Sequence, residues 1–174
     1  MKIRFKQDKR TILQILKSAG VKRKIRVIDK LNGVNERDSI NILLKVLEDQ
    51  SWVLREKAAY KLIQYGSRVV PRLERLLLRG YWYTRAAACI TLGEIGNLRP
   101  LSTIVELLLH EDNPTVIREA GTAIVKIAKS HADTFPEAYD TLNLSDGDRS
   151  RIGALLHRID PDFKDRAHTG QVHE

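Results

Sequence analysis

The sequence predicts an all-α fold in which short helical repeats stack one upon the next, and two observations support this interpretation. A pattern centred on Arg55 returns at Arg85, so that matched positions lie 30 residues apart. The apolar residues within the pattern recur at intervals of three and four, which is the spacing of one helix face. A period of this length is typical of an α-solenoid, in which each repeat is too small to bury its own apolar surface.

The two clearest copies of the pattern share an aromatic residue, an Arg, a pair of small residues, a Leu and a closing Gly. These positions are Trp52, Arg55, Ala58, Ala59, Leu62 and Gly66 in one copy and Trp82, Arg85, Ala88, Cys89, Leu92 and Gly96 in the other. Lys24 and Arg118 mark two weaker copies, upstream and downstream of these. We interpret the cation as the anchor of each unit, at the point where its first helix opens.

Each predicted unit consists of a first helix and a second helix. The units span about residues 21–50, 51–80, 81–112 and 113–141, and residues 8–20 match the second helix of an incomplete unit that caps the N-terminal end. A capping helix at 145–159 follows the last unit, so residues 1–159 are expected to form one domain. The remaining residues, 160–174, are polar and aperiodic and are predicted to form a flexible tail.

Several residues suit the ends of these helices. Ser51 and Asn113 have side chains that accept hydrogen bonds at a helix N-terminus, and Ser145 opens the C-terminal capping helix in the same way. Gly and Asn tolerate the left-handed conformation that closes a helix. The residues in the closing position of the first three units are Asn35, Gly66 and Gly96.

The segment from Arg85 to Gly96 strongly resembles the short HEAT-like repeats that are named after phycobilisome lyases. The resemblance covers about residues 22–130. It implies a right-handed α-solenoid of about four helix pairs, with first helices outside and second helices lining a concave face. It also implies that Arg55, Arg85 and Arg118 support the fold by reaching an acid or a carbonyl group of a neighbouring unit. Most such proteins are binding scaffolds, some resemble bilin lyases, and a related group excises alkylated DNA bases.

The composition indicates a soluble protein in a reducing compartment, which we expect to be the cytoplasm. Hydrophobic residues make up 43% of the chain and charged residues 30%, which is ordinary for a folded domain. The single Cys89 excludes an internal disulfide framework. No apolar run approaches the ~20 residues that span a bilayer, and the basic N-terminus leads into no signal-peptide pattern.

The net charge of +8 is distributed unevenly along the chain. Residues 1–30 have a net charge of +9, whereas residues 86–174 have a net charge of −5. Sequence order becomes spatial order in a stacked array, so we expect one basic end and one acidic end.

A row of arginines on one second helix is the main candidate binding site. Its members recur at intervals of four, three and four, so they share one helix face; they are Arg68, Arg72, Arg75 and Arg79. Lys45 holds the equivalent slot in the preceding unit, and Trp82 follows the row. We predict a basic groove that binds an acidic or amphipathic segment of a protein partner. The alternative is a solvated face that needs no partner.

Two further groups have both a binding and a structural interpretation. The basic cluster at the N-terminal end is a candidate for binding nucleic acid, or it serves only solubility; it consists of Lys17, Lys22, Arg23, Lys24 and Arg26. Trp52 and Trp82 each lie three residues before an anchor. We expect both to pack between units, although exposed tryptophans at this position would stack bases or anchor a peptide.

The sequence holds no catalytic motif that we recognise. The five His show no metal-ligand spacing, no phosphate-binding Gly loop is present, and Cys89 occupies a core slot where it is expected to be inert. We therefore predict a non-enzymatic scaffold or adaptor with a protein partner and with no cofactor, metal or membrane attachment. The alternatives are a nucleic-acid-binding protein and, less favoured, a lyase or a DNA glycosylase.

Overall fold

The computed structural model describes residues 9–31 and 34–163, and these residues are helical, with no strand among them. Their ten α-helices are α1 (Lys9–Ser18), α2 (Val21–Asp29), α3 (Glu36–Val46), α4 (Trp52–Ile63), α5 (Val70–Arg79), α6 (Trp82–Ile95), α7 (Leu101–His110), α8 (Pro114–Ser130), α9 (Phe135–Asp140) and α10 (Asp146–Ile159). A short 3₁₀ helix, η2 (Gly66–Arg68), precedes α5. Residue 8 of the predicted N-terminal cap and residues 164–174 of the predicted tail lie outside the described residues.

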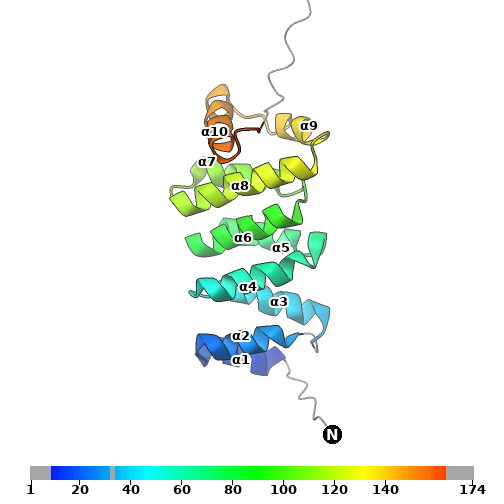
Figure 1. Cartoon of the computed structure of the whole chain (residues 1–174), viewed down its shortest axis with the longest axis vertical. Coiled ribbons are helices and arrows are strands. Elements are labelled where there is room, and N and C mark those ends of the chain that lie inside the picture. Colours follow the sequence, from blue (N-terminus) through cyan, green and yellow to red (C-terminus); the bar gives the residue numbers. More distant parts are fainter. Residues whose placement is uncertain (1–8, 32–33, 164–174) are drawn as a thin grey trace, which may run out of the picture.

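The helices follow one another along the long axis of the molecule, from α1 and α2 at one end to α9 and α10 at the other (Figure 1). Four of them, α2, α4, α6 and α8, pack in succession and form what we call the front layer. The back layer contains α1, α3, α5 and α7, in which α1 packs on α3 and α5 packs on α7. The two layers meet where α3 contacts α4, α5 contacts α6, and α7 contacts α8.

The prediction of an all-α structure is confirmed, and the helices lie where the sequence pattern places them. The front-layer helices are the predicted first helices, and each begins three or four residues before its anchor. The predicted second helices correspond to α3, α5, α7 and the short α9. The helices expected at the two ends correspond to α1 and α10.

The predicted helix-closing residues are confirmed at two positions and wrong at the third. Gly66 and Gly96 have φ angles of 55° and 66°, in the left-handed region that favours glycine. Asn35 instead has a φ of −62° and is the N-cap of α3, where its side chain accepts a hydrogen bond from the Asp38 N–H at 2.9 Å. The reason is that α2 ends at Asp29, so the segment around Asn35 already belongs to the next helix.

The other predicted N-caps lie at the expected positions. The Asn113 side chain accepts hydrogen bonds from the N–H groups of Thr115 and Val116 at the start of α8. Ser145 accepts one from the Asp148 N–H at the start of α10. Ser51 is the N-cap of α4 without a side-chain hydrogen bond to the helix.

One continuous apolar core runs from Ile12 in α1 to Leu156 in α10. The repeated Leu position contributes Leu62 and Leu92, neither of which has any exposed surface. Burial of a leucine side chain stabilises the folded state by about 1.5–3 kcal/mol, so these positions dominate the packing between neighbouring pairs.

The segment predicted to form a tail begins with residues that contact the helices. The Asp160 carboxylate lies 2.8 Å from the Lys129 ammonium group at the end of α8, and this hydrogen bond lowers the pKa of Asp160. The Phe163 ring meets the Phe135 ring of α9 edge-on, with the ring centres 6.1 Å apart. Residues 160–163 therefore extend the packed structure beyond α10.

Gly93 sets how closely α6 and α8 approach. A Cβ atom added there would lie 2.8 Å from the Ala123 backbone Cα of α8, closer than real Cβ atoms approach backbone. The absence of a side chain at this position lets the two helices pack directly against each other.

We expect Gly93→Ala to lower the free energy of unfolding by about 1–3 kcal/mol, because the new methyl group would force α6 away from α8. The measurement is urea denaturation followed by circular dichroism. Gly147→Ala is the matched control, since Gly147 lies in an exposed part of α10 with only the Ser145 hydroxyl within 4 Å of an added Cβ atom. Equal stability of the two variants would contradict this account of the α6–α8 contact.

Candidate functional site

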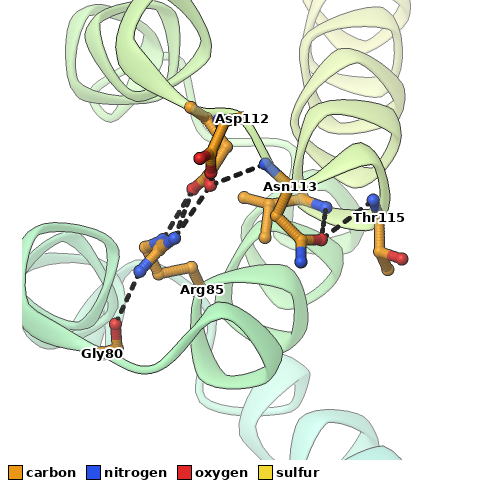
Figure 2. A network of polar contacts seen from close by, with 7 residues as sticks. Gly80, Arg85, Asp112, Asn113 and Thr115 are labelled. Atoms are coloured by element: carbon orange, nitrogen blue, oxygen red, sulfur yellow. Dashed lines mark hydrogen bonds and ion pairs between the residues drawn. The ribbon is translucent and has the colours of Figure 1, made fainter.

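The anchor Arg85 connects the start of α6 to the turn between α7 and α8. Its guanidinium donates two hydrogen bonds to the Glu111 carboxylate, at 2.7 and 2.9 Å, and one to the Gly80 carbonyl oxygen at 2.9 Å. The Glu111 side chain is 2% exposed and also accepts from the N–H groups of Asp112 and Asn113. Figure 2 shows Arg85 between Gly80 and this turn, with the Asn113 cap of α8 beside it.

The same arrangement recurs in part at the other anchors. The Lys24 ammonium group lies 2.6 Å from the Asp49 carboxylate, which itself accepts a hydrogen bond from the Ser51 N–H. Arg55 donates to the carbonyl oxygens of Asp49 and Gln50, both at 2.8 Å, and its guanidinium lies 4.9 Å from the centre of the Tyr83 ring. Lys24 thus holds the turn before the next front-layer helix, whereas the hydrogen bonds of Arg55 hold the turn before its own helix.

Arg118 does not follow this arrangement. Its side chain is 68% exposed and forms an ion pair with the adjacent Glu119, and it forms no hydrogen bond or ion pair with a neighbouring unit among the described residues. The last copy of the pattern therefore keeps the anchor residue but not its contacts.

Arg85→Ala is expected to lower the free energy of unfolding by about 3 kcal/mol, because Glu111 would keep a buried negative charge without its partner. Arg118→Ala is the control and should change it by less than about 0.5 kcal/mol, as expected of an exposed surface residue. Chemical denaturation of the two variants in parallel measures the difference. Similar losses in both would contradict the distinct roles of the two anchors.

A shallow hollow of about 400 Å³ lies between α3 and α5 in the back layer, and we call it the arginine hollow. Its lining residues are Arg37, Asn41, Leu44, Arg72, Arg75 and Leu76. Arg72 donates a hydrogen bond to the Asn41 side-chain oxygen at 3.0 Å. Within the described ranges, Arg37, Arg72 and Arg75 form no ion pair, so three guanidinium groups surround the hollow without a carboxylate partner.

The remaining residues of the predicted basic groove lie elsewhere. Arg68 forms an ion pair with Glu36, and Lys45 forms one with Glu48, so both charges are already neutralised. Arg79 is exposed at the end of α5. Trp82 belongs to the front layer, away from the hollow. The structure thus brings Arg72 and Arg75 together with Arg37, a residue that the intervals along α5 alone could not reveal.

The predicted nucleic-acid cluster lies at the N-terminal end of the stack. Lys17 is on α1, whereas Lys22, Arg23 and Arg26 are on α2, and all four side chains are exposed. Lys24 differs from them, because it is half-buried in its ion pair with Asp49. Four basic side chains therefore remain open to solvent at this end.

The largest hollow that we describe is a groove of about 790 Å³ across α4, α6 and α8, which we call the aromatic groove. Its aromatic and large apolar lining residues are Trp52, Tyr60, Ile63, Trp82, Tyr83 and Ile90. The buried alanines Ala59, Ala86 and Ala87 form its floor. Because alanine side chains are short, the surface is recessed between the larger rings.

The expectation that both tryptophans pack between units is wrong. Trp52 is 64% exposed and Trp82 is 47% exposed. The sequence did contain a signal of this surface: Trp52, Glu56 and Tyr60 recur every four residues on α4, which places them on one face. The same frame 30 residues later contains Trp82, Ala86 and Ile90. Exposed apolar patches of this kind commonly mark interaction sites.

The metal-binding potential of the described residues and the state of the single cysteine bear on the chemistry of this chain. No group of three or more His, Cys, Asp or Glu there has an arrangement that suits a metal ion. Cys89 is fully buried, and this burial raises the pKa of its thiol. A protonated, inaccessible thiol is a poor nucleophile.

We expect Cys89 in the folded protein to react with a thiol reagent such as Ellman's reagent only through unfolding. Burial blocks access and favours the unreactive protonated form at neutral pH. The rate of modification measured across a urea series should follow the unfolded fraction. Rapid reaction of the native protein at pH 7 would contradict the buried position of Cys89.

No protein-family model matches this chain, and comparison with curated proteins also gave no match. None of the helices in the described ranges has the length and apolar character needed to traverse a bilayer.

Proposed function

We propose that this protein is a non-enzymatic scaffold of the HEAT-like type that binds an acidic segment of a protein partner in the arginine hollow. The repeated anchor contacts of Lys24, Arg55 and Arg85, together with the stacked helices, support the assignment to a right-handed solenoid of HEAT-like repeats. The single cysteine supports a reducing compartment, and we propose the cytoplasm.

The observation that carries this proposal is the set of three guanidinium groups around one hollow. An arginine presents a planar set of donors that matches the two oxygens of a carboxylate. Most other cations of the back layer that are near the hollow have acidic partners, as Arg68 does in its pair with Glu36. Arg37, Arg72 and Arg75, which line the hollow together, have no such partner among the described residues, and an acidic segment would supply the missing carboxylates.

Binding of nucleic acid is the second candidate function, and the four exposed basic side chains of α1 and α2 favour it. Single-stranded nucleic acid is usually bound by basic residues interleaved with aromatic rings. In this protein the exposed tryptophans lie in a groove that also contains Glu56, Glu94 and Glu119. Glu94 and Glu119 are paired with Lys126 and Arg118, but Glu56 has no ion-pair partner among the described residues. Its carboxylate would repel a phosphate backbone at the tryptophans, so we favour the protein partner. A lyase or a glycosylase activity is the least favoured of the three functions.

A fluorescent twelve-residue peptide rich in Glu should bind the protein, and Arg72→Ala combined with Arg75→Ala should weaken that binding about tenfold or more. Each charged hydrogen bond contributes about 1.5–3 kcal/mol, so the loss of two arginines should be large. Fluorescence anisotropy measures the affinity. The control variant, Arg10→Ala with Arg158→Ala, removes the same charge from exposed positions on α1 and α10.

If the control variant weakens peptide binding equally, the effect depends only on net charge, which would contradict a defined binding site. A single-stranded DNA of twelve nucleotides distinguishes the second function in the same assay. If the DNA binds more tightly than the peptide, and Lys22→Ala with Arg23→Ala abolishes that binding, the nucleic-acid function replaces our proposal.

A further inference from the structure

We propose that the aromatic groove is a second binding site, which holds a proline-rich segment in the polyproline II conformation with a basic residue beside it. The groove lies in the front layer, across α4, α6 and α8, whereas the arginine hollow lies between two back-layer helices. The two sites share no lining residue, so this inference stands apart from the proposed function.

The groove presents apolar ring faces and hydrogen-bond donors together. Both tryptophans of the chain and Tyr60 line it, and all three side chains are largely exposed. Among the described residues, the indole N–H groups of Trp52 and Trp82 and the Tyr60 hydroxyl have no hydrogen-bond partner within the protein. A polyproline II segment complements both features. Its proline rings are apolar, and its backbone carbonyl oxygens have no hydrogen-bond donor within the segment.

The separation expected between the two helices that carry the tryptophans also suits this ligand. Trp52 and Trp82 occupy the same position of two consecutive repeats, at the starts of α4 and α6, which pack against each other. Helices in direct contact lie about 8–10 Å apart. Three residues of polyproline II span about 9 Å, which is one turn of that helix. Each tryptophan would therefore meet the ligand at successive turns.

The charge of the groove indicates a basic residue in the ligand. Glu56 lies between Trp52 and Tyr60 on the exposed face of α4, and it forms no ion pair among the described residues. The other two carboxylates of the groove are already paired, Glu94 with Lys126 and Glu119 with Arg118. Arg55 also lines the groove, but its guanidinium already donates to the carbonyl oxygens of Asp49 and Gln50 and lies over the Tyr83 ring. The unpaired Glu56 carboxylate beside the aromatic rings would attract an Arg or Lys that flanks the prolines.

An amphipathic helix fits this groove less well. A helix satisfies its own backbone hydrogen bonds, so it would leave the indole and phenol donors without acceptors. The floor of the groove consists of alanines, and its walls combine four aromatic rings with Ile63 and Ile90. Aromatic-lined grooves are the common receptors of polyproline II.

The test is titration of the full chain with a peptide of one Arg followed by eight prolines. Trp52 and Trp82 are the only tryptophans of the chain, so their fluorescence reports binding directly, and calorimetry gives the affinity. Trp82→Ala should weaken binding about tenfold or more, as expected when a central aromatic side chain is removed. Leu78→Ala is the control, because Leu78 is an exposed apolar residue of α5 in the back layer, and it should leave the affinity unchanged.

The role of Glu56 is tested separately. Glu56→Gln should weaken binding of the Arg-containing peptide about threefold, the effect expected of an exposed ion pair, and should not alter binding of a peptide made only of prolines. Glu106→Gln, which removes an exposed carboxylate from α7, should change neither affinity. Arg72→Ala with Arg75→Ala should leave the affinity for the proline peptide unchanged. The assay therefore distinguishes a loss of binding in the arginine hollow from a loss of binding in the aromatic groove.

Three results would overturn the proposal. One is the absence of a fluorescence change or heat signal up to millimolar peptide. Another is tighter binding of an amphipathic Leu/Lys helical peptide than of the proline peptide. The third is self-association of the wild-type chain in light scattering that Trp82→Ala abolishes, which would make a second copy the occupant of the groove.

Discussion

The structure depends on contacts between a cation at the start of a front-layer helix and the turn that precedes the next one, which Lys24 and Arg85 make. Arg85 is the most complete example, because its guanidinium bonds to a buried carboxylate that in turn holds the backbone of the following turn. A partly buried charge pair is stable only in a narrow geometry. The contact therefore fixes how far each helix pair is rotated from its neighbour, while the leucines of the core supply the stabilising free energy.

Both candidate surfaces follow from this stacking. In the front layer, Trp52 and Trp82 lie at the surface in equivalent positions of consecutive repeats, each three residues before its anchor. The short alanines that follow the anchors leave a recess between the rings. In the back layer, Arg72 of α5 bonds to Asn41 of α3, and Arg68 of η2 forms an ion pair with Glu36 of α3. The hollow lies between α3 and α5. One repeated frame thus generates an aromatic surface on one layer and a basic surface on the other.

The sequence predicted the helices well because each is specified by local signals. Apolar residues at helical intervals locate α1 to α10. Gly96 closes α6 as expected, whereas Gly66 has the expected left-handed conformation but lies at the start of η2, after α4 has ended at Ile63. Asn35 was misassigned because Asn suits both the end of one helix and the start of the next, and only the early end of α2 decides between them. The repeat pattern shows that one helix ends and the next begins near Asn35, but it does not show at which residue each of them does so.

The candidate sites were harder to predict because they combine residues from helices that are far apart in sequence. The interval rule found Arg72 and Arg75, but Arg37 joins them only through the packing of α3 beside α5. The tryptophans were expected in the interior since large apolar side chains usually pack there. In the structure the small alanines of α6 are buried at this position, and the tryptophans lie at the surface above them. The sequence pattern alone does not show this arrangement.

The way the stack ends at α8 has a consequence for assembly. In a repeat array without a capping helix, the last helix pair can pack on the first pair of another molecule. Such head-to-tail contacts extend into filaments unless the rotation between molecules closes a ring. Here the terminal anchor Arg118 reaches no further unit, and Ile159 of α10 lies against Gly121 of α8, while Arg151 donates a hydrogen bond to the Leu109 carbonyl oxygen. The final helix thus covers part of the surface on which a further repeat would stack.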